Sequence, residues 1–159
     1  MHSQAFGFSI KEKNIPKLLE YANVKLSEIN FNEGVYEVDF IVAGNYSKLD
    51  NLILDLTKND GESFGQFNPE PKILVKNIIL NKKDIRIVGA AKNVINFTFN
   101  NIKYVMFKAE KIIKKINELN NKINLTVIGT PNRNEYMGNV SPQIVISDVE
   151  IKEDDYLSF

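Results

Sequence analysis

Cysteine is absent from the 159 residues, and histidine occurs once, as His2. Without thiols there are no disulfides, thiolate nucleophiles or thiolate metal ligands. A single histidine argues against a multi-histidine metal site and a Ser-His-Asp triad. No run of about 18 apolar residues and no signal peptide is visible, so we expect a soluble, cytoplasmic protein without a membrane span.

Acidic residues are scarce in one long segment. Residues 72 to 133 contain 13 Lys and Arg residues but only three acids. The flanking segments are acidic, which brings the formal net charge of the whole chain to zero. A basic segment of this size indicates a polyanionic partner such as nucleic acid. The alternative is a solvated surface of ordinary lysines.

The stretch 61–71 separates two sequence patterns, because it ends in Pro69-Glu70-Pro71, which forbids a helix. Apolar spacing before it predicts two helices and a strand between them, over 15–26, 49–56 and 36–42. The pattern after it predicts strands over 73–80, 85–90, 94–99 and 102–107, a helix over 109–119, and strands over 122–129 and 143–151. Asn100-Asn101 is expected to form a tight turn, and 130–139 a loop.

This order predicts an α+β fold, in which an OB-like five-stranded antiparallel β-barrel follows a partial α/β segment. The predicted domains are a partial domain over 1–60, a dividing loop over 61–71, the barrel over 72–152 and an acidic tail over 153–159. OB-folds commonly bind oligonucleotides on one face and its loops.

Several basic and aromatic residues fall where an OB-fold presents its ligand face. Cations there would contact phosphates and aromatic rings would stack on bases. The candidate DNA-binding residues are Arg86, Lys92, Lys103, Tyr104, Arg133 and Tyr136. Lysines of the 109–119 helix are interpreted as its polar face, and Phe97 and Phe99 as core. No spacing typical of a metal site or a phosphate-binding glycine loop occurs, so no catalytic or metal-binding residue is predicted.

Four segments resemble motifs of one family. Residues 2–10 resemble a Gly-Gly-His-x-x-Ala-Ala-Gly-Phe motif, and 63–71 are similar to a Pro-Phe-Gly-x-Gly-Asn-Pro-Glu-Pro run. Residues 102–107 resemble the strand before the barrel helix, and 127–148 the last two strands. These motifs belong to the C-terminal region of RecJ-type single-strand-specific DNA exonucleases, from the end of the DHH-associated domain through the OB domain.

The resemblance implies a fragment or truncated relative of a 5′-to-3′ exonuclease of DNA repair and recombination. Residues 1–60 would then be the end of the DHH-associated domain with a connecting helix, and His2 matches a phosphate-contacting motif histidine. The catalytic Mn or Mg would be held by upstream domains, and the fragment itself would hold no cofactor. The chain departs from the family at Val94-Ile95-Asn96, where His-Leu-Lys is usual, which removes one expected nucleic-acid contact.

On this interpretation the chain is a non-catalytic, monomeric part that binds and guides single-stranded DNA. The alternative is a protein-interaction module that docks a repair partner such as a single-strand-binding protein or a helicase. A self-contained hydrolase is disfavoured because the residues for its chemistry are missing. Alone, the fragment is expected to be inactive.

Overall fold

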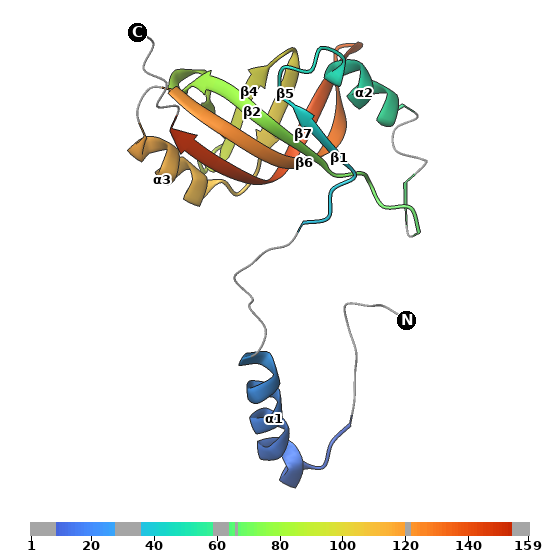
Figure 1. Ribbon diagram of the computed structural model, residues 1–159, viewed down its shortest axis with the longest axis vertical. Coiled ribbons are helices and arrows are strands. Elements are labelled where there is room, and N and C mark those ends of the chain that lie inside the picture. Colours follow the sequence, from blue (N-terminus) through green and yellow to red (C-terminus); the bar gives the residue numbers. More distant parts are fainter. Residues whose placement is uncertain (1–8, 28–35, 59–63, 66, 120–121, 154–159) are drawn as a thin grey trace. The chain divides into compact units, whose positions relative to one another are not determined.

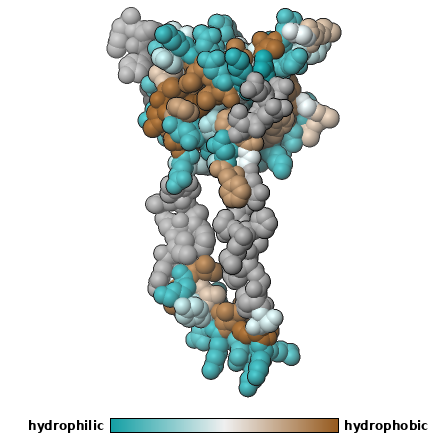
Figure 2. Space-filling view, turned by 90° about the vertical axis from the view of Figure 1, so that its right-hand side faces the viewer, coloured by the Kyte–Doolittle hydropathy of each residue, from teal (hydrophilic) through white to brown (hydrophobic). Residues whose placement is uncertain are grey.

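The computed structural model describes residues 9–27, 36–58, 64–65, 67–119 and 122–153, and it divides the chain into two units, Met1–Tyr36 and Glu37–Phe159. In the first unit a 3-10 turn, η1 (Glu12–Asn14), leads into α1 (Ile15–Ser27), which confirms the predicted helix. No residue of α1 is buried, and apolar residues such as Leu19 and Val24 are exposed. Figure 2 shows hydrophobic surface beside hydrophilic surface on this unit.

The second unit is built on one seven-stranded sheet with the order β1-β2-β6-β7-β5-β4-β3. Its elements, in chain order, are β1 (Phe40–Ala43), α2 (Leu49–Leu56), β2 (Ile73–Asn81), η2 (Lys82–Asp84), β3 (Arg86–Val88), β4 (Val94–Phe99), β5 (Ile102–Met106), α3 (Glu110–Glu118), β6 (Lys122–Tyr136) and β7 (Asn139–Glu153). The segments before and after the predicted divider thus share a sheet, because β1 pairs with β2.

The sheet curls into a barrel because β2 and β3 are nearly consecutive in the chain. β2 pairs with β6, whereas β3 pairs with β4 at the opposite end of the strand order. Only η2 and Ile85 separate the two strands, so these two parts of the sheet must lie close together. The predicted α+β fold is confirmed. Two pairings are parallel, β1 with β2 and β5 with β7, and the pattern of single strands did not reveal them.

Alternating apolar residues of the strands fill the barrel, and one helix lies at each end of it (Figure 1). Along β6 the buried positions alternate strictly, beginning with Ile123, Leu125 and Val127. Leu49 and Ile53 of α2 and Ile116 of α3 join the same core. Each fully buried Leu or Ile side chain stabilises the fold by about 1.5–3 kcal/mol.

The predicted loop over 130–139 is wrong. β6 and β7 continue through it and meet at the two-residue turn Met137-Gly138, where both residues have positive φ, as a type I′ turn requires. The pairing of β2 with β6 stops at Gly129, so Pro131 lies where β6 has no second neighbour. Proline is tolerated at such an edge because no ladder hydrogen bond needs its missing N–H.

The predicted tight turn at Asn100-Asn101 is confirmed, since both residues have positive φ between the paired Phe99 and Ile102. The side-chain amide of Asn100 donates to the carbonyl oxygens of Gly44 and Tyr46, at 3.2 and 3.1 Å. The β4–β5 hairpin is thereby fastened to the connection between β1 and α2.

Candidate nucleic-acid interface

The outer face of β3, β4 and β5 carries polar and basic side chains. Ile95 and Phe97 of β4 are buried in the core. Because successive side chains of a strand point to opposite faces, Asn96 and Thr98 face outward. Directly paired residues share a face, so Arg86, opposite Asn96, and Lys103, opposite Thr98, also lie on the outer face.

A depression of about 540 Å³ lies on this face. Its lining residues come from η2, β3, β4 and β5, namely Lys83, Asp84, Arg86, Val88, Asn96, Phe97, Thr98 and Lys103. The one acid, Asp84, accepts hydrogen bonds from the backbone and side chain of Asn81 at the start of η2. Within the described ranges no ion pair joins Lys83, Arg86 or Lys103 to an acid. The depression is therefore a site of net positive charge.

The loop between β3 and β4 borders this face and is held against the start of α3. Asn93 accepts a hydrogen bond from the Ala109 backbone N–H at 2.8 Å, and its side-chain amide donates to Glu110 Oε1 at 3.1 Å. Hydrogen bonds from its own backbone N–H and from Asn93, followed by the charge of Lys108, lower the pKa of Glu110. An ionised Glu110 thus positions the loop that carries Lys92, an exposed residue with positive φ.

Phe107 is a further candidate residue that the sequence analysis did not name. It directly follows β5, and 59% of its surface is exposed. The bond between Asn93 and Ala109 brings the β3–β4 loop beside this segment. An exposed aromatic ring beside a basic face is the usual platform for stacking a base. Alternation in β5 could not have identified Phe107, because Val105, in the same phase, is buried together with Ile102 and Tyr104.

Tyr104 is predicted from the sequence to bind DNA, but its burial contradicts this prediction. The side chain is fully buried, and its ring stacks on Phe97 with centroids 4.9 Å apart and an interplanar angle of 7°. Burial raises the pKa of the hydroxyl well above its usual range. The hydroxyl has no hydrogen-bond partner among the described residues. Tyr104 is a core residue that cannot present its ring to a ligand.

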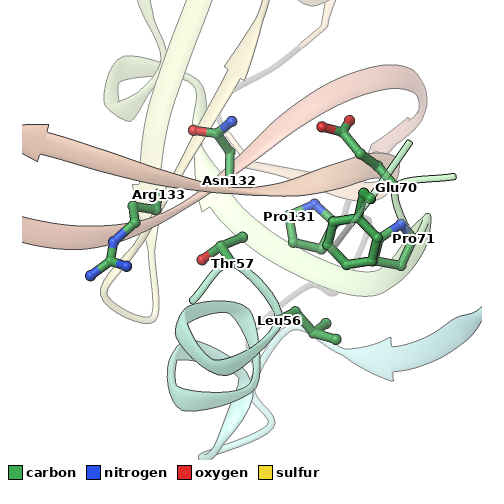
Figure 3. A pocket seen from close by; sticks show the side chains of 8 residues that line it. Leu56, Thr57, Glu70, Pro71, Pro131, Asn132 and Arg133 are labelled. Carbon is green, nitrogen blue, oxygen red and sulfur yellow. The ribbon is translucent and has the colours of Figure 1, made fainter. Parts of the chain in front are cut away.

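The remaining candidates occupy different places. Arg133 does not join Arg86 and Lys103; it lines a second pocket between β6, the end of α2 and the segment around Pro71 (Figure 3). Tyr136 is 67% exposed beside the β6–β7 turn. His2 lies outside the described residues. The structure therefore brings Arg86 and Lys103 into one depression, with Lys92 in the bordering loop.

The described residues do not offer the donors of a metal centre. Throughout residues 9–27, 36–58, 64–65, 67–119 and 122–153, no three His, Cys, Asp or Glu side chains are grouped so that they could hold an ion. Within the same ranges, every helix is too short or too polar to cross a membrane.

The connectivity of the second unit defines its class. A bent first strand formed by β2 and β3, a meander through β4 and β5, a helix, and a closing pair of strands form an OB-type barrel, as predicted. Residues 48–148 match the RecJ OB domain, and the chain belongs to that family.

The chain is 31% identical over 153 residues to a putative SPbeta prophage-derived single-strand DNA-specific exonuclease, YorK of Bacillus subtilis, covering 94% of this chain and 26% of that protein. It is 27% identical over 160 residues to the single-stranded-DNA-specific exonuclease RecJ of the same organism, covering 96% of this chain and 19% of that one. The chain thus spans about a quarter or less of the length of these relatives.

Among solved structures, RecJ of Thermus thermophilus in complex with Mn²⁺ is similar, with a TM-score of 0.61 and 17% identity. The likeness covers 92% of this chain and 20% of that one, and it shows the shared fold.

Proposed function

We propose that the OB domain of this chain binds single-stranded DNA as the non-catalytic guiding part of a 5′-to-3′ exonuclease of DNA repair and recombination. The observation that carries the proposal is the basic depression on the outer face of β3, β4 and β5, with Arg86 and Lys103 on neighbouring strands. This is the face on which OB-folds commonly bind oligonucleotides. The names of the relatives, which act on single-stranded DNA, agree with it.

The chemistry follows from the side chains of the interface. Lys83, Arg86 and Lys103 would contact phosphates, and Asn96 and Thr98 would donate and accept hydrogen bonds between them. Phe107 would stack on a base at the edge of the face. Hydrolysis, with Mn or Mg, would belong to other domains of a longer protein, and no step of it involves the residues described above.

Fluorescence anisotropy of a labelled oligo-dT across a salt series tests the proposal. We expect micromolar binding that weakens steeply with salt, because released counterions drive the association, and we expect duplex DNA to compete poorly. Arg86→Ala and Lys103→Ala should each weaken binding and reduce the salt slope by about one counterion. Lys152→Ala is the control, because Lys152 lies at the far end of β7 and pairs with Glu150.

The absence of binding at low salt would overturn the proposal. It would favour the alternative in which the barrel docks a single-strand-binding protein or a helicase. Equal binding of duplex and single strand would also contradict a guiding role, because a guide must admit only the single strand.

A further inference from the structure

A second pocket, of about 180 Å³, lies outside the basic depression. Figure 3 shows it between the C-terminal end of α2, the β6 strand and the segment that ends at Pro71. Its apolar walls are Leu56, Phe64, Pro71 and Pro131, and its polar residues are Thr57, Glu70, Asn132 and Arg133.

The size and the walls of the pocket suit one planar ring. A cavity of about 150 Å³ holds a benzene molecule, so this pocket has room for an aromatic ring of that order. The rings of Pro71, Pro131 and Phe64 offer flat apolar surfaces, on which aromatic groups pack well.

The polar residues supply donors and acceptors together. Arg133 Nε is buried and has no hydrogen-bond partner among the described residues, so it can donate to a ligand. Thr57 Oγ1 donates to the Ile53 carbonyl oxygen at 2.8 Å, which leaves its lone pairs free to accept. Glu70 can only accept when ionised, and Asn132 can do both. A planar heterocycle with N–H and carbonyl groups on its edges matches this set.

The charge around the pocket favours a base over a phosphate. Thr57 is the residue at the C-terminal end of α2, where the helix dipole places partial negative charge. The Glu70 carboxylate adds to it. The Arg133 guanidinium offsets the charge of Glu70, so the pocket has no net positive charge to attract a phosphate. The N–H groups of a nucleobase edge would be attracted to Thr57 and Glu70.

A row of polar residues connects this pocket with the basic depression. Thr98 is paired with Lys103, Lys103 with Gln143, and Gln143 with Asn132, so all four lie on the outer face of neighbouring strands. Thr98 and Lys103 line the depression, and Asn132 lines the pocket. Pro131 and Arg133, the neighbours of Asn132, point to the opposite face of β6. A base would therefore reach the pocket around the edge that β6 leaves free beyond Gly129. Three strand spacings of about 4.8 Å separate β4 from β6, a span of roughly 14 Å. An oligonucleotide of about four residues, the smallest site size of an OB-fold, suffices to reach both.

We infer that this pocket receives a single unstacked nucleobase of the strand that crosses the outer face. The inference rests on the proposed function and adds a base-binding position to it. The base enters between the proline rings and Leu56, and Arg133 donates to an acceptor on its edge.

The test is an abasic scan with the 159-residue chain. Anisotropy is measured with oligo-dT of about 12 nucleotides, within the range of OB-fold sites, and with a series in which one base at a time is removed. We expect removal at one position to weaken binding by at least about 5-fold, since stacking a base on a protein surface contributes about 1–3 kcal/mol. The sugar-phosphate backbone is intact throughout, so phosphate contacts do not change.

Two variants connect that position with the pocket. Thr57→Phe fills the pocket from α2, and Arg133→Gln removes the buried donor while keeping the side chain similar in length. Each variant should bind intact oligo-dT with the reduced affinity that the wild type shows for the sensitive abasic oligonucleotide. Removing the base at the sensitive position should then not lower the affinity of either variant any further. Lys152→Gln, which removes the same charge at the far end of β7, should retain the sensitive position.

The outcomes separate the inference from the proposed function. If intact oligo-dT binds but every position is equivalent, or if the sensitive position persists in both variants, the pocket does not hold a base while the domain still binds DNA. If intact oligo-dT does not bind, both fail together. Thermal unfolding shows whether each variant is folded, and Arg133→Gln serves if Thr57→Phe is not.

Discussion

The side-chain amide of Asn93 donates a hydrogen bond to Glu110 Oε1, and this contact fastens the β3–β4 loop to the first residue of α3. The same carboxylate lies at the positive end of the helix dipole. Loop and helix therefore depend on one ionised group, and the loop carries Lys92 to the edge of the proposed DNA-binding face.

The first prediction is a pH dependence of stability. Because the folded-state pKa of Glu110 is lowered, its charge stabilises the fold above the pKa of the unfolded chain, and this contribution is lost as pH falls through the lower, folded-state value. Glu110→Gln should therefore have a lower Tm than the wild type at pH 7, and the difference should be smaller at pH 3, because the carboxylate is protonated to a greater extent there. Thermal melts followed by circular dichroism between these values measure it. An equal Tm difference at both pH values would contradict the assignment.

A second prediction concerns the buried hydroxyl of Tyr104. Tyr104→Phe keeps the ring stacked on Phe97 and removes a polar group without a partner among the described residues, so unfolding free energy should rise by on the order of 1 kcal/mol. Tyr104→Ala, the control, should lower it by about 3–5 kcal/mol because a large core side chain is lost. Urea unfolding measures both.

Oligo-dT binding by the Tyr104→Phe variant should equal that of the wild type. Weaker binding with unchanged stability would instead return Tyr104 to the interface.

Tyr104 also shows where sequence reasoning stops. In β5 apolar residues occur in both phases, as Ile102, Tyr104 and Val105 do, so alternation does not say which face is buried. The pairing of Tyr104 with the buried Phe97 decides it, and that pairing is a tertiary fact. In β4 the phase is readable from the sequence, and Phe97 is core as predicted.

Long-range pairing is the other feature that local spacing hides. The helices and most strands follow from that spacing, but the parallel pairing of β1 with β2 joins segments some 30 residues apart. The pattern around Pro131 predicts a loop because a proline rarely continues a strand. Pro131 is accommodated because β2 begins at Ile73, opposite Gly129, and leaves β6 without a second neighbour beyond that point. Only the assembled sheet reveals such an edge.

A third prediction distinguishes a structural role of Lys82 from a DNA-binding role of the adjacent Lys83. Lys82 Nζ donates to the carbonyl oxygens of Asn117 and Leu119 at 2.8 and 3.2 Å, at the C-terminal end of α3. Lys83 lines the basic depression instead. Lys82→Met should therefore lower the unfolding free energy by about 0.5–2 kcal/mol, through lost hydrogen bonds and lost interaction with the helix dipole, and leave the salt slope of DNA binding unchanged.

Lys83→Met is the matched control, because it should weaken oligo-dT binding and reduce the salt slope while leaving the urea midpoint nearly unchanged. If both variants lose stability and neither loses affinity, the depression is not the phosphate-binding surface.

The last prediction concerns Phe107, whose ring is exposed at the end of β5. Phe107→Ala should weaken oligo-dT binding by about 5- to 150-fold, because base stacking on an aromatic ring contributes about 1–3 kcal/mol. The salt slope should not change, since no cation is lost. Phe107→Trp should restore affinity, because stacking needs only an aromatic face.

Tyr46→Ala is the control for removing an exposed aromatic ring, because Tyr46 is 45% exposed and lies just before α2. Its backbone carbonyl contacts Asn100 in the turn before β5, whereas Phe107 follows the other end of β5. It should bind like the wild type. Equal losses in the two variants would mean that ring exposure alone, and not the place of Phe107 beside the basic face, governs binding. Wild-type affinity in Phe107→Ala would leave binding to the cations of the depression and remove the stacking contact from the proposed interface.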